Sequence, residues 1–178
     1  MRQIVLLRGI NIGPRNRIAM PRLREVLRDA GFADVATYVQ SGNVLLTSDA
    51  PSARLAAECR RLITEAFGLE IDVVVRTRDE LAEVVGRNPL ADVAVDPKRY
   101  QVSFLSEEPH PDVVQKLAAF AAEDERLVAI GRELYAWHPD GAARSRLWAR
   151  LAGPALGVTA TARNWTTVTR LLGLADGS

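Results

Sequence analysis

The stretch Gln3–Ile10 (QIVLLRGI) decides the fold class of this sequence. Its apolar side chains occupy both alternating faces of an extended chain, with Leu6 on one face and Leu7 on the other. This pattern predicts a central β-strand that is covered on both sides. Gly9 and the pair Gly13-Pro14 then predict that the strand ends in a loop.

Outward from this strand, apolar periodicity and turn residues predict a complete β-α-β-β-α-β unit. The elements that we expect are strands at residues 3–10, 34–39, 44–47 and 71–76, and helices at 21–30 and 51–67. Thr77 and Glu80 have the spacing of a capping box, which predicts a further helix that ends near Gly86.

The second half of the chain repeats this order of elements. We expect strands at 100–106, 126–130, 134–138 and 158–161, helices at 111–122 and 145–152, and a last helix at 162–172. The predicted fold is therefore α+β, with two ferredoxin-like β-α-β-β-α-β repeats, the second looser, plus a C-terminal helix. The predicted domains are an N-terminal ferredoxin-like subdomain at 1–88 and a C-terminal one with the terminal helix at 99–178.

The composition predicts a cytoplasmic protein. There is no apolar run near the ~20 residues of a membrane span, and the chain opens on a strand-like segment without secretory features. The single cysteine, Cys59, excludes an internal disulfide and falls on the apolar stripe of its predicted helix, which indicates an inert core residue.

Charge is distributed unevenly along the sequence. Residues 1–24 contain six arginines and residues 141–175 contain five, and neither segment contains a carboxylate. The segment between them, 25–140, holds 21 of the 22 carboxylates against 12 basic side chains. If the two ends fold together, they form one positive face suited to an anion.

In the predicted topology the end of the first strand lies beside the start of the third strand, so two polar segments meet at one rim of the sheet. Their side chains donate many hydrogen bonds, as recognition of phosphate or carboxylate requires. The predicted ligand-binding residues are Arg8, Asn11, Asn16, Gln40, Ser41 and Asn43. An alternative interpretation is that the asparagines and glycines only fix turns.

Four further residues extend this predicted site. Arg163 and Asn164 are expected in the first turn of the last helix, where they would complete the anion site. Arg15 and Arg17 are expected to be exposed and to steer an anion electrostatically. Trp165, in phase with the apolar residues of the last helix, is interpreted as a core anchor.

The remaining polar residues do not predict a catalytic or metal site. His110 and His138 stand in turn-like contexts without a second ligand at metal-binding spacing, so we predict no metal and no cofactor. The run Glu123–Glu125 is interpreted as a solvated turn. No Ser-His-Asp arrangement can be argued from the sequence.

Three polar motifs, together with residues between the first two, resemble the DUF1697 family, bacterial proteins of uncharacterised function. The similarity spans nearly the whole chain and rests on the segments 6–13, 38–44 and 161–167, together with Asn16, Met20, Leu23 and Gly31-Phe32. Pro14 and Thr166 stand where such sequences often carry Gly and Asn. The resemblance implies an α+β fold with ferredoxin-like repeats, and it implies no established activity.

The leading functional interpretation is a cytoplasmic module that binds a phosphate-bearing ligand, a nucleotide or nucleic acid, at the rim of the N-terminal sheet. The sequence pI near 7.9 argues against general nucleic-acid coating and favours a discrete site. One alternative is an enzyme that acts on a small phosphorylated or carboxylated metabolite. Another is a protein-interaction module or homodimer in which the polar motifs are structural. We expect no membrane partner, and the sequence leaves open whether a reaction is catalysed.

Overall fold

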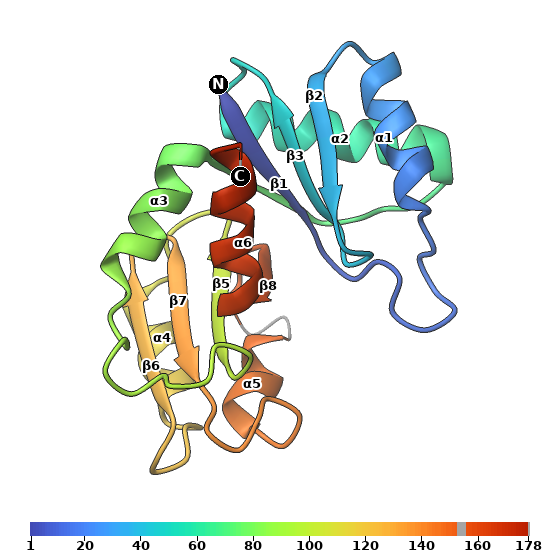
Figure 1. Cartoon of the computed structure of the whole chain (residues 1–178). Helices are drawn as coiled ribbons and strands as arrows, with labels where there is room; N and C mark the ends of the chain where they lie inside the picture. Colours follow the sequence, from blue (N-terminus) through green and yellow to red (C-terminus); the bar gives the residue numbers. More distant parts are fainter. Residues whose placement is uncertain (153–155, 178) are drawn as a thin grey trace. The chain divides into compact units, whose positions relative to one another are not determined.

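The computed structural model describes residues 1–152 and 156–177 (Figure 1). The elements, in chain order, are β1 (Arg2–Leu7), α1 (Met20–Asp29), β2 (Ala33–Tyr38), β3 (Asn43–Thr47), α2 (Ser52–Phe67), β4 (Val73–Thr77), α3 (Arg78–Arg87), β5 (Tyr100–Leu105), α4 (Pro111–Ala118), β6 (Arg126–Ile130), β7 (Glu133–Trp137), α5 (Arg146–Leu151), β8 (Ala160–Asn164) and α6 (Trp165–Ala175). The α+β fold with two β-α-β-β-α-β repeats and a C-terminal helix is thereby confirmed.

The first four strands form an antiparallel sheet in the order β2-β3-β1-β4. Val5 of β1 pairs with Val44 of β3 on one side and with Val75 of β4 on the other. The predicted central position of β1 is confirmed. Residues 4–7 are buried along both faces of this strand, as its doubly apolar pattern requires.

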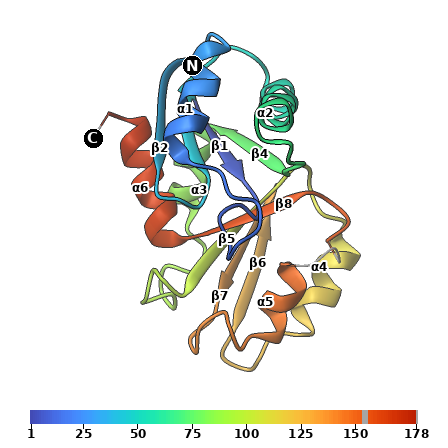
Figure 2. The same ribbon diagram turned by 90° about the vertical axis from the view of Figure 1, so that its right-hand side faces the viewer.

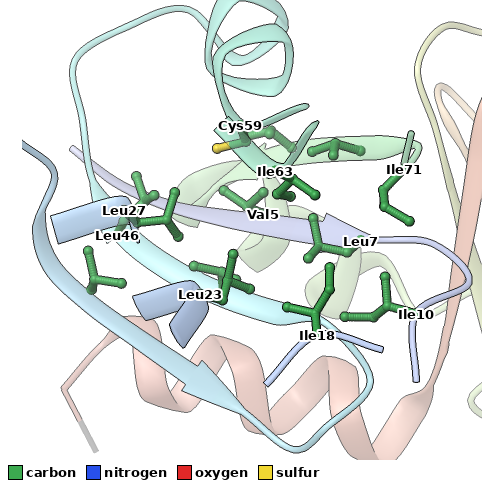
Figure 3. Packing of buried hydrophobic residues seen from close by; sticks show 14 of the residues in the cluster. Val5, Leu7, Ile10, Ile18, Leu23, Leu27, Leu46, Cys59, Ile63 and Ile71 are labelled. Carbon is green, nitrogen blue, oxygen red and sulfur yellow. The ribbon is translucent and has the colours of Figure 1, made fainter. Parts of the chain in front are cut away.

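Helices α1 and α2 cover the sheet face that carries Val5 and Leu7. Figure 3 shows Leu23 and Leu27 of α1 and Ile63 of α2 directed towards these strand residues. Cys59 of α2 belongs to the same buried cluster, and burial raises the pKa of its thiol to about 12. This confirms the predicted core position of the cysteine and keeps it a thiol at neutral pH.

The second group of strands repeats the topology as β6-β7-β5-β8, again with antiparallel neighbours. Helices α4 and α5 lie next to each other beside this sheet (Figure 2). They contribute Leu117, Leu147 and Leu151 to its core. These helices have 8 and 6 residues, against 10 and 16 in α1 and α2. The second repeat is looser in this sense, as predicted.

Aromatic side chains pack on the sheet face that carries Tyr100. Trp165, the first residue of α6, stacks on Tyr100 with ring centroids 4.9 Å apart and meets Tyr135 at 6.5 Å. The hydroxyl group of Tyr135 donates to the backbone oxygen of Val84, 2.9 Å away. Trp165 is therefore an anchor of the second repeat, in line with its apolar phase in the sequence.

The chain divides into two compact units, Met1–Ala82 with Leu171–Ser178, and Glu83–Arg170. Both divisions fall inside helices, α3 and α6, rather than in a loop. The predicted capping box opens α3, because Thr77 N donates to Glu80 Oε2 at 2.8 Å and Glu80 N donates to Thr77 Oγ1 at 3.1 Å. Across the described residues, every helix is too short or too polar to cross a membrane.

Candidate functional site

The candidate site lies in the first unit, where the loop after β1 meets the turn between β2 and β3. Ile10 and Ile18 anchor the two ends of the loop by entering the hydrophobic core beside Leu7 (Figure 3). Their side chains are 2% and 1% exposed. The residues between them, 11–17, are therefore held over the end of β1 by apolar packing at both ends of the loop.

Asn11 fastens this loop to the neighbouring turn. Its Nδ2 donates to the backbone oxygens of Ile18, at 2.9 Å, and Gln40, at 2.7 Å, while its Oδ1 accepts from Ile18 N at 2.9 Å. All three bonds use backbone groups, so the Asn11 side chain shapes the loop. The predicted meeting of the two polar segments at one rim is confirmed by the contact with Gln40.

Asn16 closes the loop upon itself. Its Nδ2 donates to Gly9 O at 3.1 Å, and its backbone oxygen accepts from Asn11 N at 3.0 Å. A short antiparallel bridge between Ile12 and Arg15 narrows the tip further. Asn11 and Asn16 have φ angles of 54° and 53°, a region that asparagine tolerates better than most residues. The turn-fixing interpretation of these two residues therefore holds for their side chains.

The turn between β2 and β3 is packed tightly against the end of β1. Asn43 is fully buried, and its Nδ2 donates to Tyr38 O at 3.0 Å and to Ser41 Oγ at 3.1 Å. Leu7 N donates to Gly42 O at 2.9 Å. A Cβ atom at Gly42 would lie 2.8 Å from Leu7 Cβ, so only glycine fits this approach. Asn43 thus supports the turn from inside.

Among the polar side chains that the rim exposes to solvent are those of Arg15, Arg17, Gln40 and Ser41. Neither Arg15 nor Arg17 forms an ion pair or a side-chain hydrogen bond with any residue that the structure describes. Arg8 is partly buried at the end of β1, and its backbone N–H donates to Asp72 O at 3.0 Å. The rim is therefore cationic on the side of the loop.

Arg163 and Asn164 belong to the second unit, and the structure corrects their predicted location. They end strand β8 instead of forming the first turn of the last helix, and Arg163 pairs with Val102 of β5. Asn164 Oδ1 accepts from Thr167 N at 2.9 Å and so caps α6. The error arose because a strand followed directly by a capped helix leaves no loop residues to mark the boundary.

The guanidinium of Arg163 is enclosed by protein, although part of the residue remains accessible. It donates to Thr161 Oγ1 at 2.8 Å and to Ala162 O at 2.9 Å. Burial lowers the pKa of Arg163 to about 10, which still leaves it charged at neutral pH. That Arg163 and Asn164 take part in the anion site, and that both basic ends share one face, stay predictions.

A buried polar cluster in the second unit was not predicted from the sequence. Glu125 is only 8% exposed, not solvated, and one of its oxygens, Oε2, lies 2.5 Å from both His138 Nδ1 and Ser145 Oγ. Its other oxygen accepts from Ala122 N at 2.9 Å. Burial opposes ionisation of Glu125, but these three hydrogen bonds outweigh it, so its pKa lies below the ordinary value.

The register of the β6–β7 hairpin could have revealed this cluster. The hairpin across Gly131-Arg132 is predicted from the sequence, and its strands pair outward as far as Arg126 with Trp137. Glu125 and His138 are the next residues outward on the two strands, so they face each other. Counting pairs from the turn would have placed the carboxylate opposite the imidazole.

Metal binding finds no support in the part of the chain that the structure describes. No group of three or more His, Cys, Asp or Glu side chains there is arranged to hold a metal ion. His138 is fully buried, and its Nε2 has no hydrogen-bond partner among the described residues. His138 meets Trp148 edge to face, with ring centroids 5.7 Å apart.

The comparisons with known proteins agree with the fold and add no activity. No curated protein matches the sequence significantly. Among solved structures, a conserved bacterial protein, SP0830 from Streptococcus pneumoniae, is similar with a TM-score of 0.79 and 22% sequence identity, over 98% of each chain. The model of the family DUF1697, described as a protein of unknown function, matches residues 1–135. The chain therefore belongs to the DUF1697 family.

Proposed function

We propose that this protein is a cytoplasmic module that binds a phosphate-bearing ligand at the rim of its first sheet. The observation that carries the proposal is the pair of exposed arginines, Arg15 and Arg17, on a loop fixed by Asn11 and by two buried isoleucines. A fixed loop presents its cations without the entropy cost of ordering a mobile one. Arg8, Gln40 and Ser41 provide further hydrogen-bond donors at the same rim.

Enzymatic function is the second candidate, because Ser145, Glu125 and His138 meet beside a cavity of about 380 Å³ that Arg99 and Arg144 also line. Activation of a serine nucleophile requires the imidazole to lie between the serine and the carboxylate. Here Ser145 and His138 contact the same oxygen of Glu125. Ser145 also caps α5 by accepting from Trp148 N at 3.0 Å. This arrangement favours a structural role for the cluster.

Isothermal titration calorimetry of the protein with AMP, ribose 5-phosphate and inorganic phosphate tests the proposal. The variant is Arg15→Gln with Arg17→Gln, and the matched control is Arg144→Gln with Arg146→Gln, two exposed arginines at the same spacing in the second unit. Loss of two exposed charges is expected to weaken binding roughly threefold to thirtyfold and to reduce its salt dependence.

The control variant is expected to bind as the wild type does. If the control loses affinity and the rim variant keeps it, the ligand site lies in the second unit and the proposal is wrong. If none of the three ligands binds to the wild type, the polar motifs are structural, and the remaining candidate is an interaction module or homodimer.

A further inference from the structure

Two of the large apolar side chains that the protein exposes lie at the proposed phosphate-binding rim. Ile12 is 72% exposed and Val39 is 51% exposed. Asn11, which precedes Ile12, is hydrogen-bonded to Gln40, which follows Val39. Ile12 and Val39 are therefore each one residue away from a hydrogen bond that joins the loop to the turn. The rim therefore combines cations with an apolar surface.

Val39 is also held in a backbone conformation that suits its side chain poorly. Its φ angle is 52°, in the left-handed region, where a β-branched residue is a genuine outlier. The other described non-glycine residues with positive φ are asparagines and one aspartate, at positions 11, 16, 34 and 88. Exposure and backbone strain each disfavour valine here, and strain of this kind clusters at functional sites.

We propose that Ile12 and Val39 support the base of a nucleoside phosphate, an inference that rests on the proposed phosphate-binding function. A nucleobase has apolar faces, which suit exposed Ile and Val, and polar edges, which suit the donor and acceptor of the Gln40 amide. Arg15 and Arg17, on the same loop as Ile12, then hold the phosphate. The nucleoside phosphate is either a free nucleotide or a residue of a single strand, because a duplex keeps its base faces stacked.

A second protein chain is a poorer fit to this surface. Stable protein interfaces bury about 800 Å² on each partner, around a core that is more apolar than the rest of the surface. At the rim, only two large apolar side chains are exposed among the described residues, which gives too small an apolar patch. A single base flanked by a phosphate matches both the size and the charge of the surface.

The test compares AMP with ribose 5-phosphate, which carries the same phosphate and sugar without the base. We expect the wild type to prefer AMP roughly threefold to tenfold, because the base buries apolar surface. Val39→Asn is expected to abolish this preference and to leave the affinity for ribose 5-phosphate unchanged. The melting temperature of Val39→Asn is expected to equal or exceed that of the wild type, because asparagine tolerates positive φ.

Ile12→Ser is a second variant, and it does not alter a residue with a strained backbone. Val95→Asn is the control, because Val95 is 81% exposed in the other unit. Ile12→Ser is expected to lose the preference for AMP, and Val95→Asn is expected to keep it. Adding a single-stranded tetranucleotide and a duplex separates the two sources of the nucleoside phosphate. Tighter binding of the tetranucleotide than of AMP indicates a nucleic acid, and equal binding indicates a free nucleotide.

Equal affinity of the wild type for AMP and ribose 5-phosphate would overturn the inference while leaving phosphate binding intact. A preference for AMP that survives in both Val39→Asn and Ile12→Ser would also overturn it. Failure of every phosphate compound to bind would overturn the proposed function itself, and the base-binding inference with it.

Discussion

The two ferredoxin-like repeats share a strand order but place their polar side chains differently. In the first repeat, polar residues after the first strand form a loop in which asparagine side chains bind backbone and two arginines face solvent. In the second repeat, two carboxylates are enclosed and paired, Glu125 with His138 and Glu133 with Arg87. The same strand order thus carries an exposed polar loop in the first unit and enclosed, paired carboxylates in the second.

This difference separates residues that stabilise the fold from residues that are available for binding. A buried ionisable group must be paired and hydrogen-bonded, so its loss is felt as a loss of stability. An exposed arginine on a fixed loop contributes little to folding and remains available to an anion. Substitutions of the enclosed carboxylates in the second unit should therefore change stability, and substitutions of the rim arginines should change binding.

The largest effect is expected from Glu125→Ala. It leaves His138, Ser145 and Ala122 N without their shared acceptor inside the protein, which is expected to destabilise the second unit by about 3–5 kcal/mol. Tryptophan fluorescence during urea unfolding reports on this unit, because Trp137, Trp148 and Trp165 all lie in it. Asp124→Ala, an exposed neighbour, is the control and should change stability by less than about 0.5 kcal/mol.

Equal effects of Glu125→Ala and Asp124→Ala would show that the buried cluster is not a stabilising element of the second unit. The enclosed carboxylate would then not distinguish the second repeat from the first in stability.

The next largest effect is expected from Gly42→Ala in the first unit. Its new Cβ would lie 2.8 Å from Leu7 Cβ and 2.9 Å from Ile10 Cδ1, at a φ of 86°. Backbone strain and overpacking together are expected to cost about 2–4 kcal/mol. Gly13→Ala is the matched control, since it also has positive φ but nothing within 4 Å, and should cost only about 1–2 kcal/mol.

The hydrogen-exchange rates of the β1 amides measure this difference in stability, because β1 lies inside the sheet of the first unit. If the β1 amides exchange as slowly in Gly42→Ala as in Gly13→Ala, the turn is not packed tightly against Leu7.

A smaller effect concerns pH. Because the folded protein lowers the pKa of Glu125 below its ordinary value of 4.5, ionised Glu125 contributes stability above that value. This contribution is lost as the pH falls through the lowered folded-state pKa. The stability difference between wild type and Glu125→Gln is therefore expected to be larger at pH 7 than at pH 3. If the stability difference between wild type and Glu125→Gln is the same at pH 7 and pH 3, the folded protein does not hold Glu125 as a hydrogen-bonded carboxylate.

The smallest effect on stability is expected from Arg15→Gln with Arg17→Gln. Both side chains are exposed and, among the described residues, unpaired, so the free energy of unfolding should change by less than about 0.5 kcal/mol. Urea unfolding followed by circular dichroism measures it. A loss of more than about 1 kcal/mol would show that these arginines hold the loop together.

The fold was predictable from the sequence because its cues are local. The doubly apolar pattern at residues 3–7 marked a central strand, and Thr77 with Glu80 marked a helix start. The meeting of Asn11 with Gln40 followed from strand order alone. The exposure of Arg15 and Arg17 followed from their place in a polar loop.

The features that the sequence did not predict depend on the tertiary structure. Glu125 lies in an acidic run that is typical of a solvated turn, and only the hairpin register and the approach of Ser145 bury it. Arg163 and Asn164 looked like a helix start because β8 passes into α6 without a loop. The conformation of Val39 has no signal in a sequence that reads as ordinary strand.

The location of the binding site is tested by the pattern of amide chemical-shift changes in an NMR titration of the ¹⁵N-labelled protein with AMP. Binding at the rim predicts saturable shifts in residues 8–17 and 39–43, which require roughly threefold to thirtyfold more AMP to reach half saturation in Arg15→Gln with Arg17→Gln. The amides of Glu125, His138 and Ser145 should stay in place. Shifts confined to those residues, or no saturable shift anywhere, would contradict the account.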